Sequence, residues 1–444
     1  MSEPGIIRVL PDTLANKIAA GEVVQRPASV AKELLENAID AGASNVHLVL
    51  KQAGRELVQS VDDGCGMSAE DAVMCFRRHA TSKIRHADDL LQLYTLGFRG
   101  EAMAAIGSVA QVELKTKRVG DEAGTLIRLN GGEMVSNEPC ATPNGTSIAV
   151  RNLFYNVPAR RNFLKSNATE FKHLVETFQF IALSNPDVGF KLTHDGNVVH
   201  DLPALSGASI DEALKARIGG LFGDKAAASL VPVGEETSYL SMNGFVAKPE
   251  FSRRTRGEQF LFVNGRYIKS RHLDHAVSNA YGDMLPKGSY PFYALFLRVD
   301  PQHVDVNVHP TKAEVKFDDE RGVYGFVLAV VRKALGSADI TPNFGFDASG
   351  RLKERYGTPI LGRSTPPAGV SRPPSTSPSS TVGSFDSPAN PTREYERADP
   401  DQRDIFAIRP DRSEPGRILF GMDAAAEPPG DAGDGARSRV VPAA

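Results

Sequence analysis

One segment, Val30–Ala43, constrains the fold of this chain most, because VAKELLENAIDAGA is typical of an amphipathic helix with an acidic face. At about 100° per residue, Glu33, Asn37 and Asp40 fall within a narrow arc of the helix. Its alanines, leucines and isoleucine cluster on the opposite side, which predicts that this side packs against a core. The segment alone also fits a surface helix with a solvated acidic face, so the choice depends on the motifs that come after it in the chain.

Two glycine-rich turns after this segment favour a cavity over a bare surface. The strand-like residues 57–61 lead into DDGCG at 62–66, which places a carboxylate at a strand end where the backbone can approach a ligand closely. LGFRGEAM at 96–103 opens a predicted helix, and free N–H groups at a helix start suit phosphate. Each turn alone is also an ordinary loop. Together with the acidic helix face, they predict one shared site.

The remaining periodicity predicts two mixed units. In the first, we expect further strands at 45–50, 112–117, 125–129 and 146–150 and helices at 11–21 and 69–77. Asn144-Gly145, before the last of these strands, is a hairpin signal. A second unit begins near residue 210, with strands expected at 230–247, 259–263 and 290–299 and helices at 272–281 and 322–335. This pattern predicts a small α/β domain.

Composition limits the class of protein. A chain of 444 residues with 41% hydrophobic residues suggests two or three folded units. The net charge of −3 means that any nucleic-acid contact must come from a local basic patch. The three cysteines, Cys65, Cys75 and Cys140, favour reduced thiols over a disulfide or zinc site. With neither a signal-peptide pattern nor a membrane-spanning run, we expect a cytoplasmic protein.

The last hundred residues have a different composition. Of the 29 prolines, 15 lie in 342–444, among Ser, Thr, Gly and Asp. Such a stretch buries too little apolar surface to offset its ordering entropy, so we predict a disordered linker over 339–444. RDIFAIRP and GRILFG are short apolar islands within it, for which chance composition is favoured over docking motifs.

The order of these motifs resembles the GHKL ATPases, which include gyrase-type topoisomerase subunits, heat-shock chaperone ATPases, histidine kinases and MutL mismatch-repair proteins. The ENAIDAGA helix, DDGCGM, HATSK, GFRGEAM and NGTSIAV occur in the GHKL order. AAGEVVQRPASVAKELLENAIDAGA, FYNVPARRNFL, FVNGRYIK and DVNVHPTKAEVKF resemble MutL specifically. The resemblance covers about residues 6–335 and is highly specific.

The resemblance implies an α+β fold. Residues 1–209 would form a GHKL (Bergerat-type) ATPase α/β sandwich, residues 210–338 a ribosomal-protein-S5-like α/β transducer domain, and residues 339–444 the linker. We find no counterpart of the family's C-terminal dimerisation domain or of its DQHAxHE-type endonuclease motif. We therefore expect a truncated chain or one without that unit.

The resemblance also implies a division of chemical roles. Glu33 would be the general base for the attacking water, and Asn37 would give an amide oxygen to Mg²⁺. Asp62, supported by Thr146, would accept a hydrogen bond from the adenine amino group. Lys312, in DVNVHPTK, would reach the γ-phosphate of ATP, although a solvated turn lysine is the alternative. The remaining expected ATP-site residues are Asp40, Gly64, Gly66, Met67, Thr81, Ser82, Lys83, Gly97, Phe98, Arg99, Gly100, Glu101, Ala102 and Met103.

Within this group, HATSK and GFRGEAM would form a lid loop over the phosphates, with Gly97 and Gly100 as hinges. Direct phosphate contact by Lys83 is the less favoured of its possible roles.

The DNA-binding candidates are basic residues without a groove-reading motif, so we expect contacts to phosphates that are independent of sequence. They are Arg253, Arg254, Arg256, Arg266, Lys269 and Arg271, with Arg160, Arg161 and Lys165 as a possible extension. A solvated basic face is the alternative.

The resemblance implies a Mg²⁺-dependent ATPase that acts as an ATP-switched matchmaker in DNA mismatch repair. Its partners would be DNA, a MutS-like mismatch sensor, a downstream endonuclease or helicase, and a second copy that joins its N-terminal domains on ATP binding. We expect a cytoplasmic, nucleoid-associated protein. A topoisomerase subunit, a chaperone ATPase and a nucleotide-dead scaffold are the alternatives.

Overall fold

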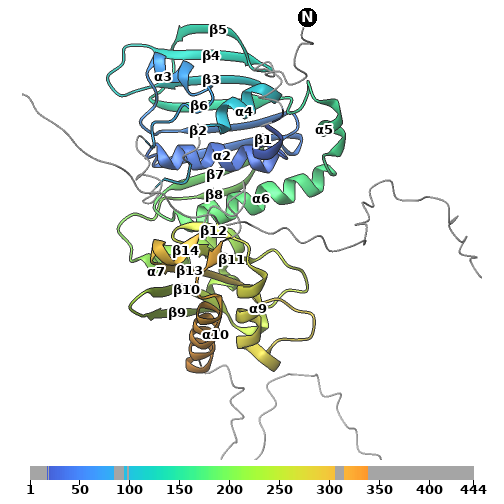
Figure 1. The fold of residues 1–444 in the computed structure, drawn as a ribbon, viewed down its shortest axis with the longest axis vertical. Helices are drawn as coiled ribbons and strands as arrows, with labels where there is room; N and C mark the ends of the chain where they lie inside the picture. The colour runs from blue at the N-terminus through green and yellow to red at the C-terminus, as the bar shows by residue number, and fades with distance from the viewer. Residues whose placement is uncertain (1–17, 19, 85–94, 98–99, 306–314, 339–444) are drawn as a thin grey trace, which may run out of the picture. The chain divides into compact units, whose positions relative to one another are not determined.

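The computed structural model describes residues 18, 20–84, 95–97, 100–305 and 315–338. Its larger sheet has eight strands in the order β5-β4-β3-β6-β2-β1-β7-β8 (Figure 1). β1 and β7 run parallel, whereas the other neighbours are antiparallel. The strands are β1 (Asn45–Lys51), β2 (Leu57–Asp62), β3 (Gln111–Lys117), β4 (Gly124–Asn130), β5 (Glu133–Cys140), β6 (Gly145–Arg151), β7 (Gly189–His194) and β8 (Asn197–Leu202).

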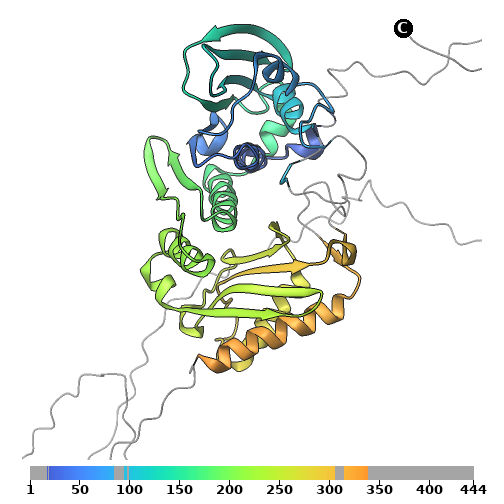
Figure 2. The same ribbon diagram turned by 90° about the vertical axis from the view of Figure 1, so that its left-hand side faces the viewer.

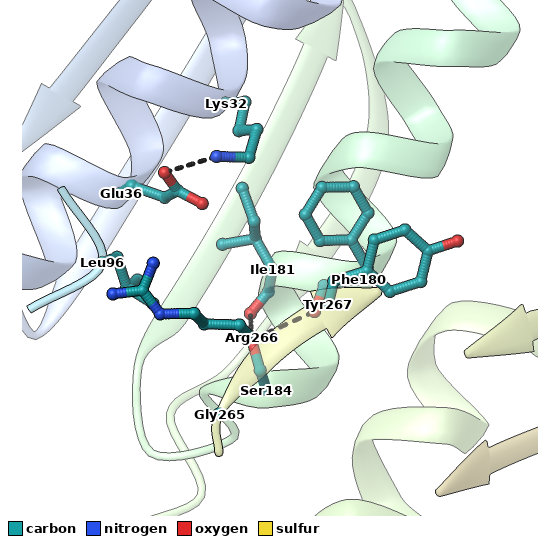
Figure 3. A pocket seen from close by; sticks show the side chains of 9 residues that line it. All are labelled: Lys32, Glu36, Leu96, Phe180, Ile181, Ser184, Gly265, Arg266 and Tyr267. Atoms are coloured by element: carbon teal, nitrogen blue, oxygen red, sulfur yellow. Dashed lines mark hydrogen bonds and ion pairs between the residues drawn. The ribbon is translucent and has the colours of Figure 1, made fainter. Parts of the chain in front are cut away.

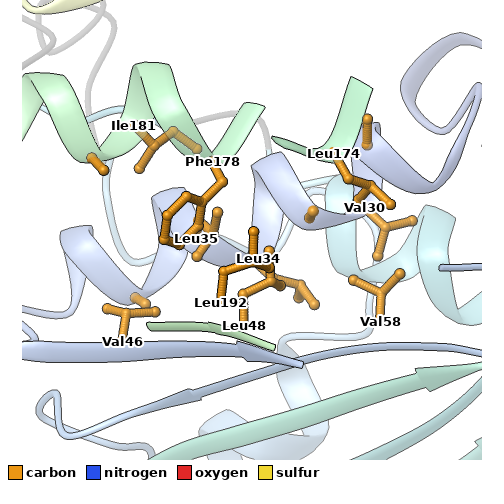
Figure 4. Close-up of a cluster of buried hydrophobic side chains, with 14 of the residues drawn as sticks. Val30, Leu34, Leu35, Val46, Leu48, Val58, Leu174, Phe178, Ile181 and Leu192 are labelled. Atoms are coloured by element: carbon orange, nitrogen blue, oxygen red, sulfur yellow. The ribbon is translucent and has the colours of Figure 1, made fainter. Parts of the chain in front are cut away.

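The amphipathic segment forms helix α2 (Pro27–Asp40), which lies between the sheet and helix α6 (Asn167–Ser184). Figure 4 shows Leu34 and Leu35 of α2 among side chains of α6 and of the underlying strands. Both leucines are at most 2% exposed, and each buried leucine contributes about 1.5–3 kcal/mol. Packing of this face therefore fixes where the opposite, polar face points.

Shorter helices complete this part of the chain. Residues 18 and 20–23 are helical, and the rest of the helix expected at 11–21 lies outside the described residues. The helix expected at 69–77 ends earlier, at Met74, after a start that Ser68 caps by accepting the N–H of Asp71 (3.1 Å). The helices are α3 (Ala69–Met74), α4 (Ala102–Val109) and α5 (Pro158–Phe163), with a short 3₁₀ turn η1 (Gln52–Gly54).

The hairpin expected at Asn144-Gly145 is wrong. β5 is an edge strand paired with β4, whereas β6 lies between β3 and β2, so the intervening loop crosses between distant sheet positions. Gly145 has φ +106°, and a Cβ there would lie 2.1 Å from the carbonyl oxygen of Asp62. Glycine is therefore required at position 145 because two backbones approach each other closely there, and not because of a two-residue turn.

The second domain is built on a five-stranded sheet in the order β12-β11-β13-β10-β9. β11 and β13 are parallel, and the expected strand at 230–247 is a hairpin of two strands. The strands are β9 (Leu230–Glu236), β10 (Leu240–Ala247), β11 (Gln259–Val263), β12 (Arg266–Ile268) and β13 (Tyr293–Val299), with a small pair of β14 (Val304–Asp305) and β15 (Lys316–Phe317).

Helices cover this second sheet and bury two apolar clusters. α9 (Arg271–Tyr281) and α10 (Glu320–Ser337) pack on each other and close one cluster. Figure 2 shows α10, in orange, along one face of the second sheet. α7 (Ile210–Phe222) and α8 (Asp224–Ala228) belong to the other cluster, which continues into the first sheet. Short 3₁₀ turns are η3 (Pro249–Phe251), η4 (Gly282–Met284) and η5 (Pro301–His303).

The apolar core is therefore continuous across residues 209 and 210, where we expect a domain boundary. The expected linker at 339–444 lies outside the described residues. In the part of the chain that the structure describes, every helix is too short or too polar to cross a membrane.

Candidate functional site

The polar face of α2 is half-buried and turned toward two loops. Asp40, with a side chain only 6% exposed, lies at the end of the helix. Its Oδ1 accepts the N–H of Leu96 (3.0 Å) and its Oδ2 accepts the N–H of Gly97 (3.1 Å). These bonds fasten the segment Thr95–Gly97, which we call the strap, to the end of α2.

Lys83 reaches the same face from the HATSK loop. Its Nζ donates to Asp40 Oδ2 (2.5 Å) and to Asn37 Oδ1 (3.0 Å). Two oxygens of α2, one helical turn apart, therefore converge on one cation. The structure places Lys83 beside the amide that the resemblance assigns to Mg²⁺.

This donor set fits magnesium, a hard cation that prefers oxygen ligands and keeps several waters. The residues that the structure describes contain no cluster of three or more His, Cys, Asp or Glu side chains with metal-site geometry. Asn37 Oδ1, which accepts from Lys83 Nζ at 3.0 Å, is an amide oxygen of the kind that magnesium prefers.

Glu33 has an environment suited to proton transfer. The neighbouring cation, Lys32 Nζ, lies 3.9 Å from Glu33 Oε1 but only 2.7 Å from Glu36 Oε2. Lys32 therefore pairs chiefly with Glu36. The side chain of Glu33 remains 26% exposed, so water can reach its carboxylate.

Asp62 ends β2 at the other end of the expected site. Its Oδ1 accepts the N–H groups of Gly64 (3.0 Å) and Thr146 (3.2 Å). Burial raises the pKa of Asp62 to about 6, although both hydrogen bonds act to lower the pKa. The structure therefore brings Thr146 into contact with Asp62, through its backbone.

Thr116 of β3 is a member of this cluster that the sequence reasoning missed. It is fully buried, and its Oγ1 accepts the N–H of Met67 (2.9 Å) and lies 3.1 Å from Thr146 Oγ1. The alternation of VELKT puts Thr116 on the same inward side as Val112 and Leu114. A hydroxyl on an otherwise apolar buried side was the available signal.

Gly66 gives the backbone its close approach at this end. It has φ +67°, and a Cβ there would lie 2.2 Å from the carbonyl oxygen of Lys117. Gly64 and Met67 flank this turn and donate their N–H groups to Asp62 and Thr116 respectively. The DDGCGM turn is therefore fixed on β3 and β6.

The second glycine-rich turn leads into α4, which starts at Ala102 and includes Met103, with Glu101 as its N-cap residue. Glu101 Oε1 lies 3.5 Å from His79 Nδ1 and 3.9 Å from Arg78, which ties this helix start to the HATSK loop. Within that loop, Thr81 Oγ1 accepts the N–H of Lys83 (3.2 Å), and Ser82 lies between them. Gly100 belongs to the described residues, whereas Phe98, Arg99 and Lys312 lie outside them.

Five of the six DNA-binding candidates are exposed. Arg253 lies over the ring of Phe251 (4.5 Å) and pairs with Glu258, and Arg256 lies over the ring of Tyr290 (4.8 Å). The exposed candidates are Arg253, Arg254, Arg256, Lys269 and Arg271.

Arg266 differs from the other five. Its side chain is half-buried, and its Nη2 donates to the carbonyl oxygen of Thr95 (3.0 Å) in the strap. Figure 3 shows its guanidinium turned toward Leu96 and Glu36. The structure thus separates Arg266 from the expected basic surface, because β12 directs it toward the first domain.

Comparison with known proteins gives separate matches for the first and the second domain. Residues 25–151 match the family model described as "Histidine kinase-, DNA gyrase B-, and HSP90-like ATPase". Residues 218–336 match the model described as "DNA mismatch repair protein, C-terminal domain".

Among similar proteins, the DNA mismatch repair protein MutL of Christiangramia forsetii is 51% identical over 351 residues, which are 79% of this chain and 56% of the relative. MutL of Flavobacterium johnsoniae is also 51% identical, over 79% of this chain and 53% of its own length. The chain belongs to the MutL family. MutL of Phocaeicola vulgatus is 44% identical over 90% of this chain and 62% of the relative. The chain thus spans little more than half the length of these MutL relatives.

A solved structure described as the N-terminal domain of a DNA repair protein superposes with a TM-score of 0.63 and 22% identity, over 74% of this chain and 99% of that one. This likeness shows the fold. Membership of the MutL family confirms the expected α+β class, in which a GHKL ATPase domain precedes a ribosomal-protein-S5-like domain. The boundaries expected at 209/210 and 338/339 stay predictions.

Proposed function

We propose that this MutL-family chain binds and slowly hydrolyses Mg-ATP and acts as a nucleotide-switched matchmaker in DNA mismatch repair. The observation that carries the proposal is the convergence of Asn37, Asp40 and Lys83 at one end of α2, with Glu33 one turn earlier on the same face. Oxygen donors, a cation and a water-accessible carboxylate are the groups that phosphoryl transfer to water requires.

Adenine would bind at Asp62. An ionised carboxylate accepts a hydrogen bond from the amino group of adenine, whereas guanine would present a carbonyl oxygen to it and leave the acceptor unpaired. Thr116 and Thr146 hold the surrounding backbone in place, and Gly66 lets this turn approach the backbone of Lys117 closely. The hydrogen-bonded turn would therefore present one fixed acceptor to the base.

The phosphates would lie along the polar face of α2. Magnesium, when bound, supplies positive charge that neutralises the phosphate oxygens. Asn37 would hold this ion by its Oδ1, and the N–H groups at the start of α4 would face the phosphates. Glu33 would orient a water molecule and accept its proton at the carboxylate. We infer that Lys312 senses the γ-phosphate.

The hydrolysis cycle would act as a switch. ATP binding would order the lid and the N-terminal segment and join the N-terminal domains of two copies, and hydrolysis would reset them. The paired copies would bind DNA through phosphate contacts and connect a MutS-like sensor to a downstream endonuclease or helicase. This role places the protein in the cytoplasm, at the nucleoid during repair.

The testing experiment measures the size of the chain by light scattering with ADP and with a non-hydrolysable ATP analogue, alongside phosphate release from ATP. We expect a dimer with the analogue only, and slow release. A monomer under both conditions would contradict the switch, and absence of phosphate release would contradict the ATPase.

A chaperone ATPase is the alternative that the same fold allows. ATP-dependent retention on DNA separates the two functions, because a chaperone would have no preference for the duplex. Retention that is equal with ADP and with the ATP analogue would contradict the repair function.

A further inference from the structure

Arg266 belongs to the second domain but contacts the first. β12, which carries it, is placed against α6 by Tyr267, whose ring stacks on that of Phe180 (centroids 4.3 Å apart, planes 6° apart). From this position the guanidinium Nη2 donates to the carbonyl oxygen of Thr95, at 3.0 Å. A rigid aromatic contact thus fixes the origin of a long side chain whose end binds the strap.

The pocket around Arg266 is charged on both sides. Lys32, Glu36 and Leu96 line it from the first domain, with Lys32 and Glu36 paired at 2.7 Å (Figure 3). Burial lowers the pKa of Arg266, and Glu36 and Asp40 act against this effect. These carboxylates favour the charged guanidinium, which is the stronger donor to a carbonyl.

The strap carries the contact onward to the candidate ATP site. Thr95 Oγ1 donates to the carbonyl oxygen of Gly97 (2.9 Å), which closes the strap on itself. The N–H groups of Leu96 and Gly97 then bind Asp40. A Cβ at Gly97 would lie 3.2 Å from Lys83 Nζ and 3.8 Å from Asn37 Oδ1. Consecutive contacts therefore run from the second domain to the residue that would hold magnesium.

We propose that Arg266 is a positioning residue that holds the strap against Asp40 and thereby couples the second domain to the nucleotide site. The nucleotide part of this inference rests on the proposed function. If the strap is already ordered, less conformational entropy is lost when nucleotide binds beside Asn37. Removing the donor of Arg266 should therefore weaken both the strap and the nucleotide complex.

Hydrogen exchange without nucleotide tests the first half. Arg266→Met keeps the apolar stem and removes the donor, and we expect exchange at the Leu96 and Gly97 amides to accelerate about fivefold, the factor that corresponds to about 1 kcal/mol. Arg266→Lys keeps a cationic donor and should restore part of the protection. Arg298→Met, at an exposed site of the same sheet, is the matched control and should leave both amides unchanged.

Unchanged exchange in Arg266→Met overturns the proposal. Equal acceleration in the Met and Lys variants overturns it too, since that result assigns the effect to packing alone.

Nucleotide binding tests the second half. Titration with a fluorescent Mg-ATP analogue should show about fivefold weaker binding by Arg266→Met, an intermediate value for Arg266→Lys and the wild-type value for Arg298→Met. Faster exchange with unchanged affinity overturns the coupling. If the wild-type chain binds no nucleotide, the proposed function fails, whereas the exchange measurement still decides whether Arg266 holds the strap.

Discussion

Asp62 and Asp63 are adjacent in the sequence, but their carboxylates lie in opposite electrostatic environments. Burial raises the pKa of Asp62 to about 6. Asp63 is exposed, and although desolvation acts to raise its pKa, hydrogen bonds from Asn45 and Ser44 lower the pKa below its ordinary value. Ionisation therefore destabilises the folded chain at Asp62 and stabilises it at Asp63.

The first prediction concerns the pH dependence of stability. The pKa of Asp62 rises from 3.8 to about 6 on folding, so its contribution is complete below pH 3.8 and is lost as pH rises through 6. Asp62→Asn removes this titration and keeps an oxygen for the N–H groups of Gly64 and Thr146. We expect the variant to gain about 1–2 kcal/mol relative to wild type between pH 3.5 and pH 8, discounted for partial exposure, as measured by chemical denaturation.

Asp63→Asn is the matched control and has the opposite sign. Because folding lowers the pKa of Asp63, its carboxylate stabilises the fold at pH values above the pKa of the unfolded chain. This stabilisation is lost as the pH falls through the pKa of the folded chain. The variant should thus be less stable than wild type at pH 7 and approach it in acid. If both variants changed stability in the same direction with pH, the contrast between the two carboxylates would be wrong.

A second prediction concerns the general base. Glu33→Ala should abolish hydrolysis while ATP binding and ATP-dependent dimerisation remain, because this carboxylate is assigned to water and not to the nucleotide. Phosphate release and equilibrium binding of a fluorescent ATP analogue measure the two effects separately.

Asn37→Ala gives the necessary contrast. It removes the amide oxygen assigned to magnesium, so Mg-ATP binding itself should weaken. Loss of turnover alone in both variants would contradict the division of roles along α2.

The sequence predicted α2 well because its signal is strong and local. The helical spacing of leucine and polar residues is a local property of the sequence, so it predicts the two faces without knowledge of the tertiary structure. The buried Leu34–Leu35 side and the Glu33–Asn37 side both lie where this spacing predicts. For the same reason the sequence predicted β1, β2, β3, β4 and β6 of the first sheet, whereas β5, β7 and β8 were not predicted. The sequence of β5, EMVSNEPC, is largely exposed and has no clear alternation.

Long-range relationships were not available from local pattern. Gly145 looked like a hairpin residue, yet its role depends on the backbone of Asp62, more than eighty residues away. The turn between β9 and β10 contains no Gly or Pro, so two strands were predicted as one. Nothing in the local sequence distinguishes Arg266 from the exposed Lys269. Only the packing of Tyr267 on Phe180 turns Arg266 toward the strap.

The third prediction concerns the coupling of the second domain to the terminal phosphate. Lys312→Ala should lower turnover more than ADP affinity, since the role assigned to this lysine gives it contact with the γ-phosphate only. Steady-state phosphate release and ADP titration check the two effects. Equal losses of ADP and ATP binding would place Lys312 elsewhere, in a structural role.

The last prediction concerns DNA, for which Arg271 is the best-placed candidate. It is exposed and begins α9, a helix whose N-cap Ser270 accepts the N–H of Leu273 (3.2 Å). A cation at a helix start adds to the positive end of the helix dipole, and both favour a phosphate group. This placement predicts contacts with the DNA backbone and not with its bases.

Arg271→Glu should therefore weaken binding about equally for matched and mismatched duplexes, because the contact carries no sequence information. Reversal should cost more than the neutral Arg271→Gln, and the slope of log affinity against log salt should fall by about one unit. Fluorescence anisotropy across a salt series measures both. Arg298→Glu changes the charge equally at an exposed site of β13 and controls for net charge. Normal affinity of Arg271→Glu at low salt would reject this contact and direct attention to Arg253, Arg254 and Arg256, since their guanidinium groups remain exposed on the same domain.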